Sequence, residues 1–124
     1  MKESDLSSTS TESLVLGKAA VKAGDRLGLP DSLLATLLAV DVAKLRALRK
    51  GLHLLEPEAE QWRNALMLVR IYEGLLCVVS NDYEARRWLS SENLALGGQP
   101  IDLLTQQGGL DGLLLYLDAA RAVG

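Results

Sequence analysis

The residues best suited to chemistry are four basic side chains, Lys44, Arg46, Arg49 and Lys50. They fall within residues 42–55, a segment that contains no acidic residue and therefore carries a charge of +4. Because Lys and Arg bind the phosphates of nucleic acids, this cluster predicts a DNA contact. The whole chain has a formal net charge of −3, which argues against a general nucleic-acid coat protein and confines any contact to this segment.

These basic residues lie in a segment with the spacing of a helix-turn-helix unit. Helices are expected over about residues 31–38 and 42–50, joined by a short turn. Leu45 and Leu48 would anchor the second helix, and Val40 would fill the core between the two helices. The second helix would then present Val42, Ala43, Lys44 and Ala47 to base edges, and Arg46, Arg49 and Lys50 to phosphates.

Two features of this segment depart from the usual DNA-binding pattern. Ala39 stands in the turn where glycine is usual, and most of the base-facing positions are apolar. Lys44 could reach guanine, whereas Val42 and Ala43 could contact thymine methyl groups. The alternative is a helix-turn-helix that is retained for packing, with its basic residues merely solvated. A single unit of this size binds weakly, so specific recognition would require a dimer on a two-fold site.

Side chains suited to catalysis or metal binding are scarce. The chain has one His (His53) and one Cys (Cys77), which excludes a disulfide framework and a Cys/His zinc site built by one chain. We expect Cys77 to be a small buried apolar residue rather than a nucleophile. Asp82 and Glu84 could form an acid–base pair, but Asp82 is better explained as a helix cap. The sequence therefore predicts a protein that is not an enzyme and holds neither a metal nor a cofactor.

The elements that must position these residues are predicted to be helices. Apolar residues recur at helical spacing, and no alternating stretch is bounded by hairpin turns, so the fold class is all-α. We expect a flexible tail over residues 1–13, a helix-turn-helix domain over 14–55 and a small helical domain over 56–124, with Ser13 as the first N-cap. No apolar run is long enough to span a membrane, which favours a cytoplasmic protein. Further helices are expected over about residues 57–80, 83–91, 100–106 and 110–122.

The most distinctive pattern of the sequence lies between residues 85 and 109. It contains Trp-Leu, then Asn-x-Ala-Leu-Gly-Gly-x-Pro, then a hydrophobic residue followed by Asp-Leu-Leu, and finally Thr and Gly. This pattern resembles the toxin-binding domain of the Xre/MbcA/ParS antitoxin family, over about residues 70–124. Residues 35–51 are similar, more loosely, to the Xre-like helix-turn-helix of the same family.

The resemblance implies the antitoxin of a type II toxin–antitoxin system. Its partner would be a RES-domain toxin, of a class that consumes NAD by glycohydrolase or ADP-ribosyl-transfer chemistry. The antitoxin would bind this toxin and obstruct its NAD pocket, while its amino half would bind the promoter DNA of its own operon and repress it. Members of the family form homodimers and larger complexes with the toxin.

Matched by position, the resemblance places the toxin contact in the carboxyl half of the chain. The two arginines beside the Trp are added because Arg and aromatic residues dominate binding hot spots. The toxin-facing residues are then Arg86, Arg87, Trp88, Asn93, Leu96, Gly97, Gly98 and Pro100, with Arg121, Val123 and Gly124 at the chain end. Trp88 could instead belong to the core, and Gly97 and Gly98 could only shape the loop. The chain end could enter the toxin's nucleotide cleft or could be a frayed terminus.

Two other functions remain open from the sequence. One is a stand-alone dimeric helix-turn-helix transcriptional regulator with no toxin partner. The other is an adaptor domain whose helix-turn-helix is vestigial. A neighbouring gene for a RES-domain protein would favour the antitoxin, and its absence would favour these rivals.

Overall fold

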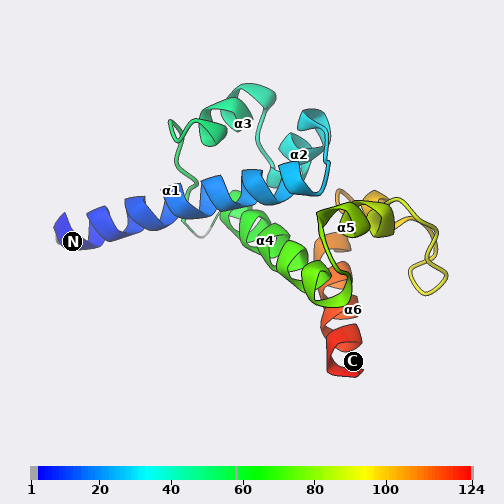
Figure 1. The fold of residues 1–124 in the computed structure, drawn as a ribbon. Coiled ribbons are helices and arrows are strands. Elements are labelled where there is room, and N and C mark those ends of the chain that lie inside the picture. Colours follow the sequence, from blue (N-terminus) through cyan, green and yellow to red (C-terminus); the bar gives the residue numbers. More distant parts are fainter. Residues whose placement is uncertain (1–2, 58, 124) are drawn as a thin grey trace.

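The chain folds as a set of helices that pack around one core (Figure 1). The computed structural model describes residues 3–57 and 59–123, with side chains described for residues 10–57 and 59–122. Its helices are α1 (Glu3–Arg26), α2 (Asp31–Leu38), α3 (Val42–Arg49), α4 (Glu60–Val78), α5 (Asp82–Leu89), the 3-10 helix η1 (Pro100–Leu103) and α6 (Gly109–Val123). The described residues contain no β-strand, only one isolated bridge, so the prediction of an all-α fold is confirmed. None of the described helices is both long and apolar enough to cross a membrane.

Helix α1 starts earlier than expected. It begins at Glu3, so the start predicted at Ser13 is wrong, and the residues expected to form a polar tail continue the helix. Once packing has nucleated a helix, each added residue gains a backbone hydrogen bond even without an apolar face. Ser13 is instead buried within α1, where its hydroxyl donates to the Leu55 carbonyl over 2.7 Å. This bond fastens the segment that follows α3 to the middle of α1.

Helix α4 is central to the core because it packs against both α1 and α6 (Figure 1). Its inner side carries fully buried residues, among them Leu68 and Ile71. Gly74 faces α6, where the Leu117 side chain lies 3.6 Å from the place that a Cβ on Gly74 would take. One cluster of buried residues extends from α1 to α6, so the segments predicted as two domains share this core.

The last turn of α4 differs from what the sequence predicted for it. Cys77 is exposed, so its expected burial is wrong. Leu76 and Val78 beside it are exposed as well, whereas Leu75 is fully buried. Consecutive residues of a helix point in different directions, so an unbroken apolar run cannot all face a core that lies on one side.

Side-chain caps set the start of two short helices. Asp41 accepts a hydrogen bond from the Lys44 N–H over 2.7 Å at the start of α3, as expected. At the start of α5 the cap is Asn81, which accepts from the Glu84 N–H over 2.9 Å. The cap predicted at Asp82 is therefore wrong, because the residue before it occupies that position and leaves the Asp82 carboxylate free for other partners.

Candidate functional site

Helix α3 turns one side to the core and the other to solvent. Leu45 and Leu48 are fully buried, as their spacing predicted. The predicted DNA-facing residues are exposed or partly exposed: Val42, Ala43, Lys44, Arg46, Ala47, Arg49 and Lys50. The outer side of α3 is therefore accessible to a partner.

The turn between α2 and α3 has the backbone conformation that glycine favours. Ala39 has φ 60° and ψ 40°, and it is the only non-glycine residue with a positive φ in the described part of the chain. Its N–H donates to the Thr36 carbonyl over 3.1 Å, and the Val40 N–H donates to the Ala35 carbonyl over 3.0 Å. Val40 then packs against the core, as predicted. The turn thus keeps the expected geometry without the usual glycine.

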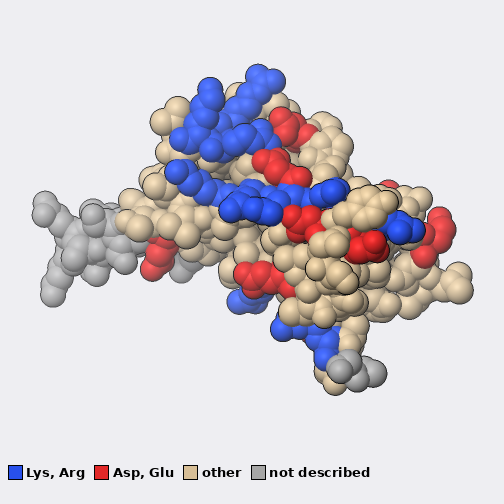
Figure 2. Space-filling view, in the orientation of Figure 1, with Lys and Arg blue, Asp and Glu red and all other residues tan. Residues whose placement is uncertain are grey.

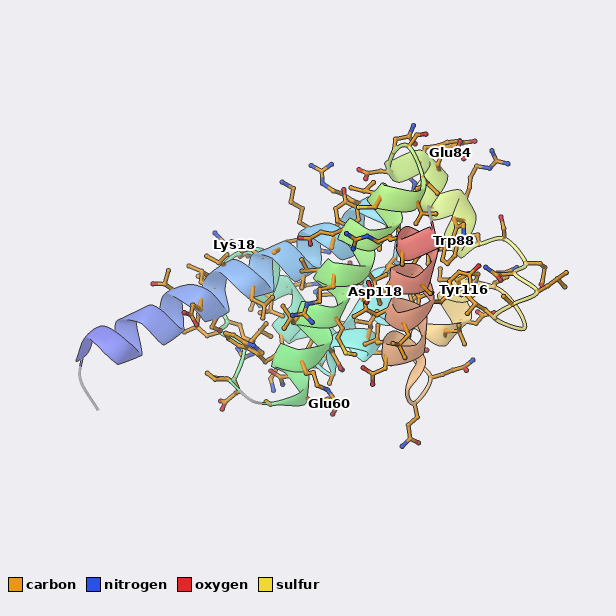
Figure 3. All side chains as sticks on the ribbon, turned by 90° about the horizontal axis from the view of Figure 1, so that it is seen from below. Lys18, Glu60, Glu84, Trp88, Tyr116 and Asp118 are labelled. Atoms are coloured by element: carbon orange, nitrogen blue, oxygen red, sulfur yellow. The ribbon has the colours of Figure 1, made fainter. Side chains whose placement is uncertain are left out.

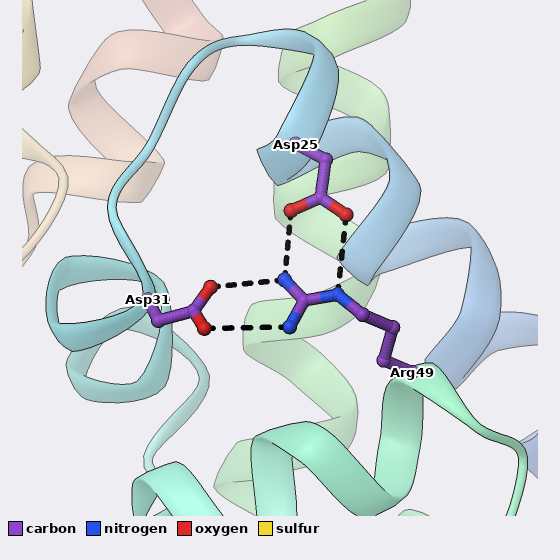
Figure 4. A network of polar contacts seen from close by, with 3 residues as sticks. All are labelled: Asp25, Asp31 and Arg49. Atoms are coloured by element: carbon purple, nitrogen blue, oxygen red, sulfur yellow. Dashed lines mark hydrogen bonds and ion pairs between the residues drawn. The ribbon is translucent and has the colours of Figure 1, made fainter.

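Arg49 joins three helices to one another (Figure 4). Its guanidinium, at the end of α3, donates to Asp25 of α1 over 2.8 and 3.3 Å and to Asp31 of α2 over 2.9 and 3.4 Å. Hydrogen bonds from Arg49 lower the pKa of Asp31 below its usual range, and the two carboxylates raise the pKa of Arg49. These bonds use four of the five N–H groups of the guanidinium, and the two carboxylates beside it would repel a DNA phosphate.

The remaining basic residues of α3 gather with basic residues of α1. In Figure 2 a group of Lys and Arg side chains covers α3 at the top, and a second band runs along α1 below it. Lys18 connects the two, because its Nζ lies 3.2 Å from the place that a Cβ on Gly51 would take. The exposed members are Lys44, Arg46 and Lys50 on α3, and Lys18 and Lys22 on α1. Sequence reasoning missed the two α1 lysines, although their spacing of four residues on one helix was an available indication.

The two arginines of α5 have different environments. Arg86 donates to the backbone carbonyl of Arg26 over 2.9 Å, which ties α5 to the end of α1. Arg87 lies over the Tyr83 ring, 5.9 Å from its centroid, and 3.8 Å from the Glu84 carboxylate. The Arg87 side chain is still 64% exposed. Both predicted toxin contacts are thus exposed, and Arg86 is the one held by a bond to another helix.

Asp82 fixes the start of α5 against two other helices. Its carboxylate accepts a hydrogen bond from the Tyr72 hydroxyl of α4 over 2.7 Å and from Arg26 of α1 over 3.1 Å. The bond from Tyr72, followed by that from Arg26, lowers the pKa of Asp82, whereas burial first of all raises the pKa of Tyr72. The acid–base pair considered for Asp82 and Glu84 is thus replaced by a structural link.

Trp88 and Tyr116 form the base of the loop that follows α5 (Figure 3). Their ring centroids are 6.1 Å apart, the ring planes meet at 30°, and both side chains pack against the core. The Asn93 side chain donates to the Tyr116 hydroxyl over 3.5 Å and accepts from the Leu96 N–H over 3.2 Å. Its backbone exchanges hydrogen bonds of 2.9 and 3.2 Å with Gly98. Trp88 and Asn93, both predicted toxin contacts, therefore also shape this loop.

The loop exposes a different leucine from the one predicted to contact the toxin. Leu96 is half-buried against the core and Pro100 is buried, so both serve packing. Leu94, in contrast, is 99% exposed. Gly97 is exposed with φ 77°, a conformation that favours glycine. Sequence reasoning noted Leu94 as an apolar loop residue but did not include it among the contacts.

Helix α6 also exposes a large apolar residue. Leu113 and Leu117 are fully buried, whereas Leu115 is 70% exposed. Arg121 is exposed, and its guanidinium lies 4.0 Å from the Asp118 carboxylate. The predicted contacts at the Val123 side chain and at Gly124 lie outside the described residues.

Two polar hollows flank α4. The larger, with a volume of about 430 Å³, has Arg63, Asn64 and Gln106 in its wall, and the smaller, of about 300 Å³, lies between Arg70 of α4 and Asp118 of α6. Within the described ranges, no group of three or more His, Cys, Asp or Glu side chains could hold a metal ion.

The chain is thus a small helical protein with exposed basic residues on α3 and exposed apolar side chains in the loop and on α6. Residues 75–122, which comprise the end of α4, α5, the loop, η1 and most of α6, match the family model of the antitoxin Xre/MbcA/ParS C-terminal toxin-binding domain. The resemblance predicted for the carboxyl half is thus confirmed. No curated protein matches the chain. The similarity indicates an antitoxin of a toxin–antitoxin system, with a toxin protein as its partner.

Proposed function

We propose that this protein neutralises a RES-domain, NAD-consuming toxin by binding it and blocking its active site. The observation that carries the proposal is the match of residues 75–122 to an antitoxin toxin-binding domain. The exposure of Arg87 and of the loop tip at Leu94 supports it, because Arg and large apolar side chains are effective anchors in protein interfaces.

Neutralisation of this kind requires no catalytic residue in the antitoxin. An inhibitor that occupies another protein's active site acts through the area it buries, on the order of 1,000 Å² or more for a stable complex. The protein would be non-enzymatic, and it would act in the cytoplasm, where both NAD and its promoter DNA are found.

We further propose that the protein forms a homodimer and represses its own operon by binding the promoter DNA through α2 and α3. The exposed outer side of α3, its Asp41 cap and the basic residues around it support this role. In this role Lys44 would contact a base edge, and Arg46 and Lys50 would contact phosphates. Lys18 and Lys22 of α1 would extend the phosphate contact beyond the helix that the sequence indicated.

The toxin-binding function is tested with a RES-domain toxin, sought first among the genes beside that of this protein. Expression of the toxin alone should arrest growth and deplete NAD, and co-expression of the antitoxin should restore both. Purified antitoxin should also suppress NAD consumption by the purified toxin at a fixed molar ratio. Continued depletion of NAD in the presence of excess folded antitoxin would contradict the proposal.

The DNA-binding function is tested by neutralising the exposed charges of α3. Lys44→Ala with Arg46→Ala should weaken binding to the promoter by at least about tenfold near 0.1 M salt and reduce the salt dependence of the affinity. Arg63→Ala with Arg70→Ala on α4 removes the same charge elsewhere and should have little effect. Equal affinities for the two double variants would favour a helix-turn-helix that serves packing alone. Promoter binding without any rescue from the toxin would favour the stand-alone transcriptional regulator.

A further inference from the structure

We propose that the toxin docks on a loop–helix surface, defined as the loop of residues 93–98 and the exposed side of α6, with Leu94 and Leu115 as its anchors. This inference rests on the proposed function and specifies where the toxin binds. Leu94 is 99% exposed and Leu115 is 70% exposed, which leaves two large apolar side chains in water. Exposed apolar surface of this kind marks an interaction site when it is contiguous.

The loop and α6 are joined by a contact between two residues that are neighbours of these leucines in the sequence. The Asn93 side chain contacts the Tyr116 hydroxyl over 3.5 Å, and Tyr116 stacks on Trp88 (Figure 3). Leu94 directly follows Asn93 in the sequence, and Leu115 directly precedes Tyr116. The backbone that carries both anchors is therefore held in place before a partner arrives, which reduces the entropy lost on binding.

The exposed side of α6 continues from Leu115 as a row of uncharged residues. Gly112, Ala119 and Ala122 are exposed, and together with Leu115 they are spaced by three, four and three positions. Residues with this spacing lie along one side of a helix. Leu115 is therefore the one large side chain in a row of small, uncharged residues that a partner could cover.

At two positions of this surface, contacts within the chain do not explain why the residue is glycine. A Cβ on Gly98 or on Gly112 would meet no atom within 4 Å, and neither residue has a φ in the left-handed region. Glycine within a helix such as α6 is less favourable than alanine by about 1 kcal/mol. Since nothing in the chain requires a missing side chain at these positions, we infer that the backbone of the partner approaches them closely.

The charge of this region fits an NAD-consuming toxin better than a second copy of the chain. The α6 part of this surface carries two acidic residues, Asp111 and Asp118, and one basic residue, Arg121, whereas the loop of residues 93–98 carries no charge. An enzyme that binds the pyrophosphate of NAD presents positive charge at its pocket, which attracts an acidic surface. A second copy of this surface would carry the same net negative charge and would gain no such attraction. In addition, the whole surface lies within the segment similar to an antitoxin's toxin-binding domain.

The anchors are tested by measuring, by calorimetry, the affinity of the full chain for the RES-domain toxin identified in the test of the proposed function. Leu94→Ser and Leu115→Ser should each weaken binding by about tenfold, as expected for losing the burial of a leucine side chain. Leu52→Ser is the matched control, because Leu52 is 78% exposed outside this surface and should leave the affinity unchanged. Affinities equal to that of the natural chain for both anchor variants would overturn the inference.

The close approach at Gly112 is tested separately from folding. Gly112→Gln should keep or raise the thermal midpoint, because Gln favours a helix, yet weaken toxin binding by about tenfold or more through a steric clash. Gly74→Ala, a helical glycine that faces Leu117 inside the protein, should leave binding unchanged. Undiminished binding by Gly112→Gln would contradict the close approach. If the natural chain itself failed to bind the toxin, the proposed function would fail as well, so the two failures are distinguishable.

Discussion

Ala39 is held in a conformation that disfavours its own Cβ, and this makes the turn between α2 and α3 a point of measurable strain. In the left-handed region a glycine is more stable than alanine by about 1 kcal/mol. We therefore predict that Ala39→Gly raises the free energy of unfolding by about that amount, as measured by urea denaturation.

The control for this substitution is Ala43→Gly, in the first turn of α3. There the same exchange takes place in a helical backbone and should lower the free energy of unfolding by up to about 1 kcal/mol. A fall in stability for both variants would show that the turn does not favour glycine.

The lowered pKa of Asp82 predicts how stability depends on pH. A carboxyl whose pKa is lower in the folded state stabilises the protein above its unfolded pKa of about 3.9, and this contribution is lost as the pH falls through the folded pKa. Asp31, which is bound by Arg49, acts in the same direction. We expect Asp82→Asn to reduce stability at neutral pH and to make the acid loss less steep.

Urea unfolding at several pH values between about 6 and 2.5 measures this dependence directly. Asp118→Asn is the control, because its carboxylate lies 4.0 Å from Arg121 in an exposed pair that contributes little. Identical slopes for the natural chain and for Asp82→Asn would contradict the link between Asp82, Tyr72 and Arg26.

At the scale of the elements, Gly74 lies where α4 packs against α6, and a glycine within a helix lowers the stability of that helix. A Cβ at this position would lie 3.6 Å from the Cβ of Leu117, which is an ordinary packing distance. Gly74→Ala should therefore raise the free energy of unfolding by up to about 1 kcal/mol through helix propensity. A loss of stability in urea denaturation would mean that α4 and α6 pack more closely than this distance indicates.

The sequence predicted the short helices better than it predicted the ends of the long ones. The helices at residues 31–38 and 42–49 were located almost to the residue, because Asp41 and the stop at Gly51 are local features. The start of α1 and the exposure of Cys77 were missed. The first depends on propagation from packed turns, and the second depends on where the core lies relative to the end of α4.

The candidate site was predicted only where local sequence determines it. The exposed side of α3 followed from helical spacing, but the partners of Arg49 did not, because Asp25 and Asp31 lie 24 and 18 residues away on other helices. In the same way, the exposure of Leu94 in place of Leu96 is decided by how the loop rests on Trp88 and Tyr116. Contacts between helices that are far apart in the sequence cannot be predicted from the spacing of residues within one segment.

For the whole molecule, the shared core predicts one cooperative unfolding transition. Helix α1 packs on both α3 and α4, and the buried cluster extends from α1 to α6. Fluorescence of Trp62 in α4 and Trp88 in α5 should therefore lose its native signal at the same urea concentration as the far-ultraviolet helix signal. Two separate transitions would instead favour independent domains over residues 14–55 and 56–124.

The central claim is that this protein binds and silences a RES-domain toxin through its carboxyl half. Its most direct test is a calorimetric titration of the purified full chain into the RES-domain toxin, with NAD consumption followed in the same samples. The account predicts saturable binding with a Kd below about 1 μM and a loss of NAD consumption that parallels occupancy. No binding, or binding that leaves NAD consumption unchanged at saturation, would contradict it.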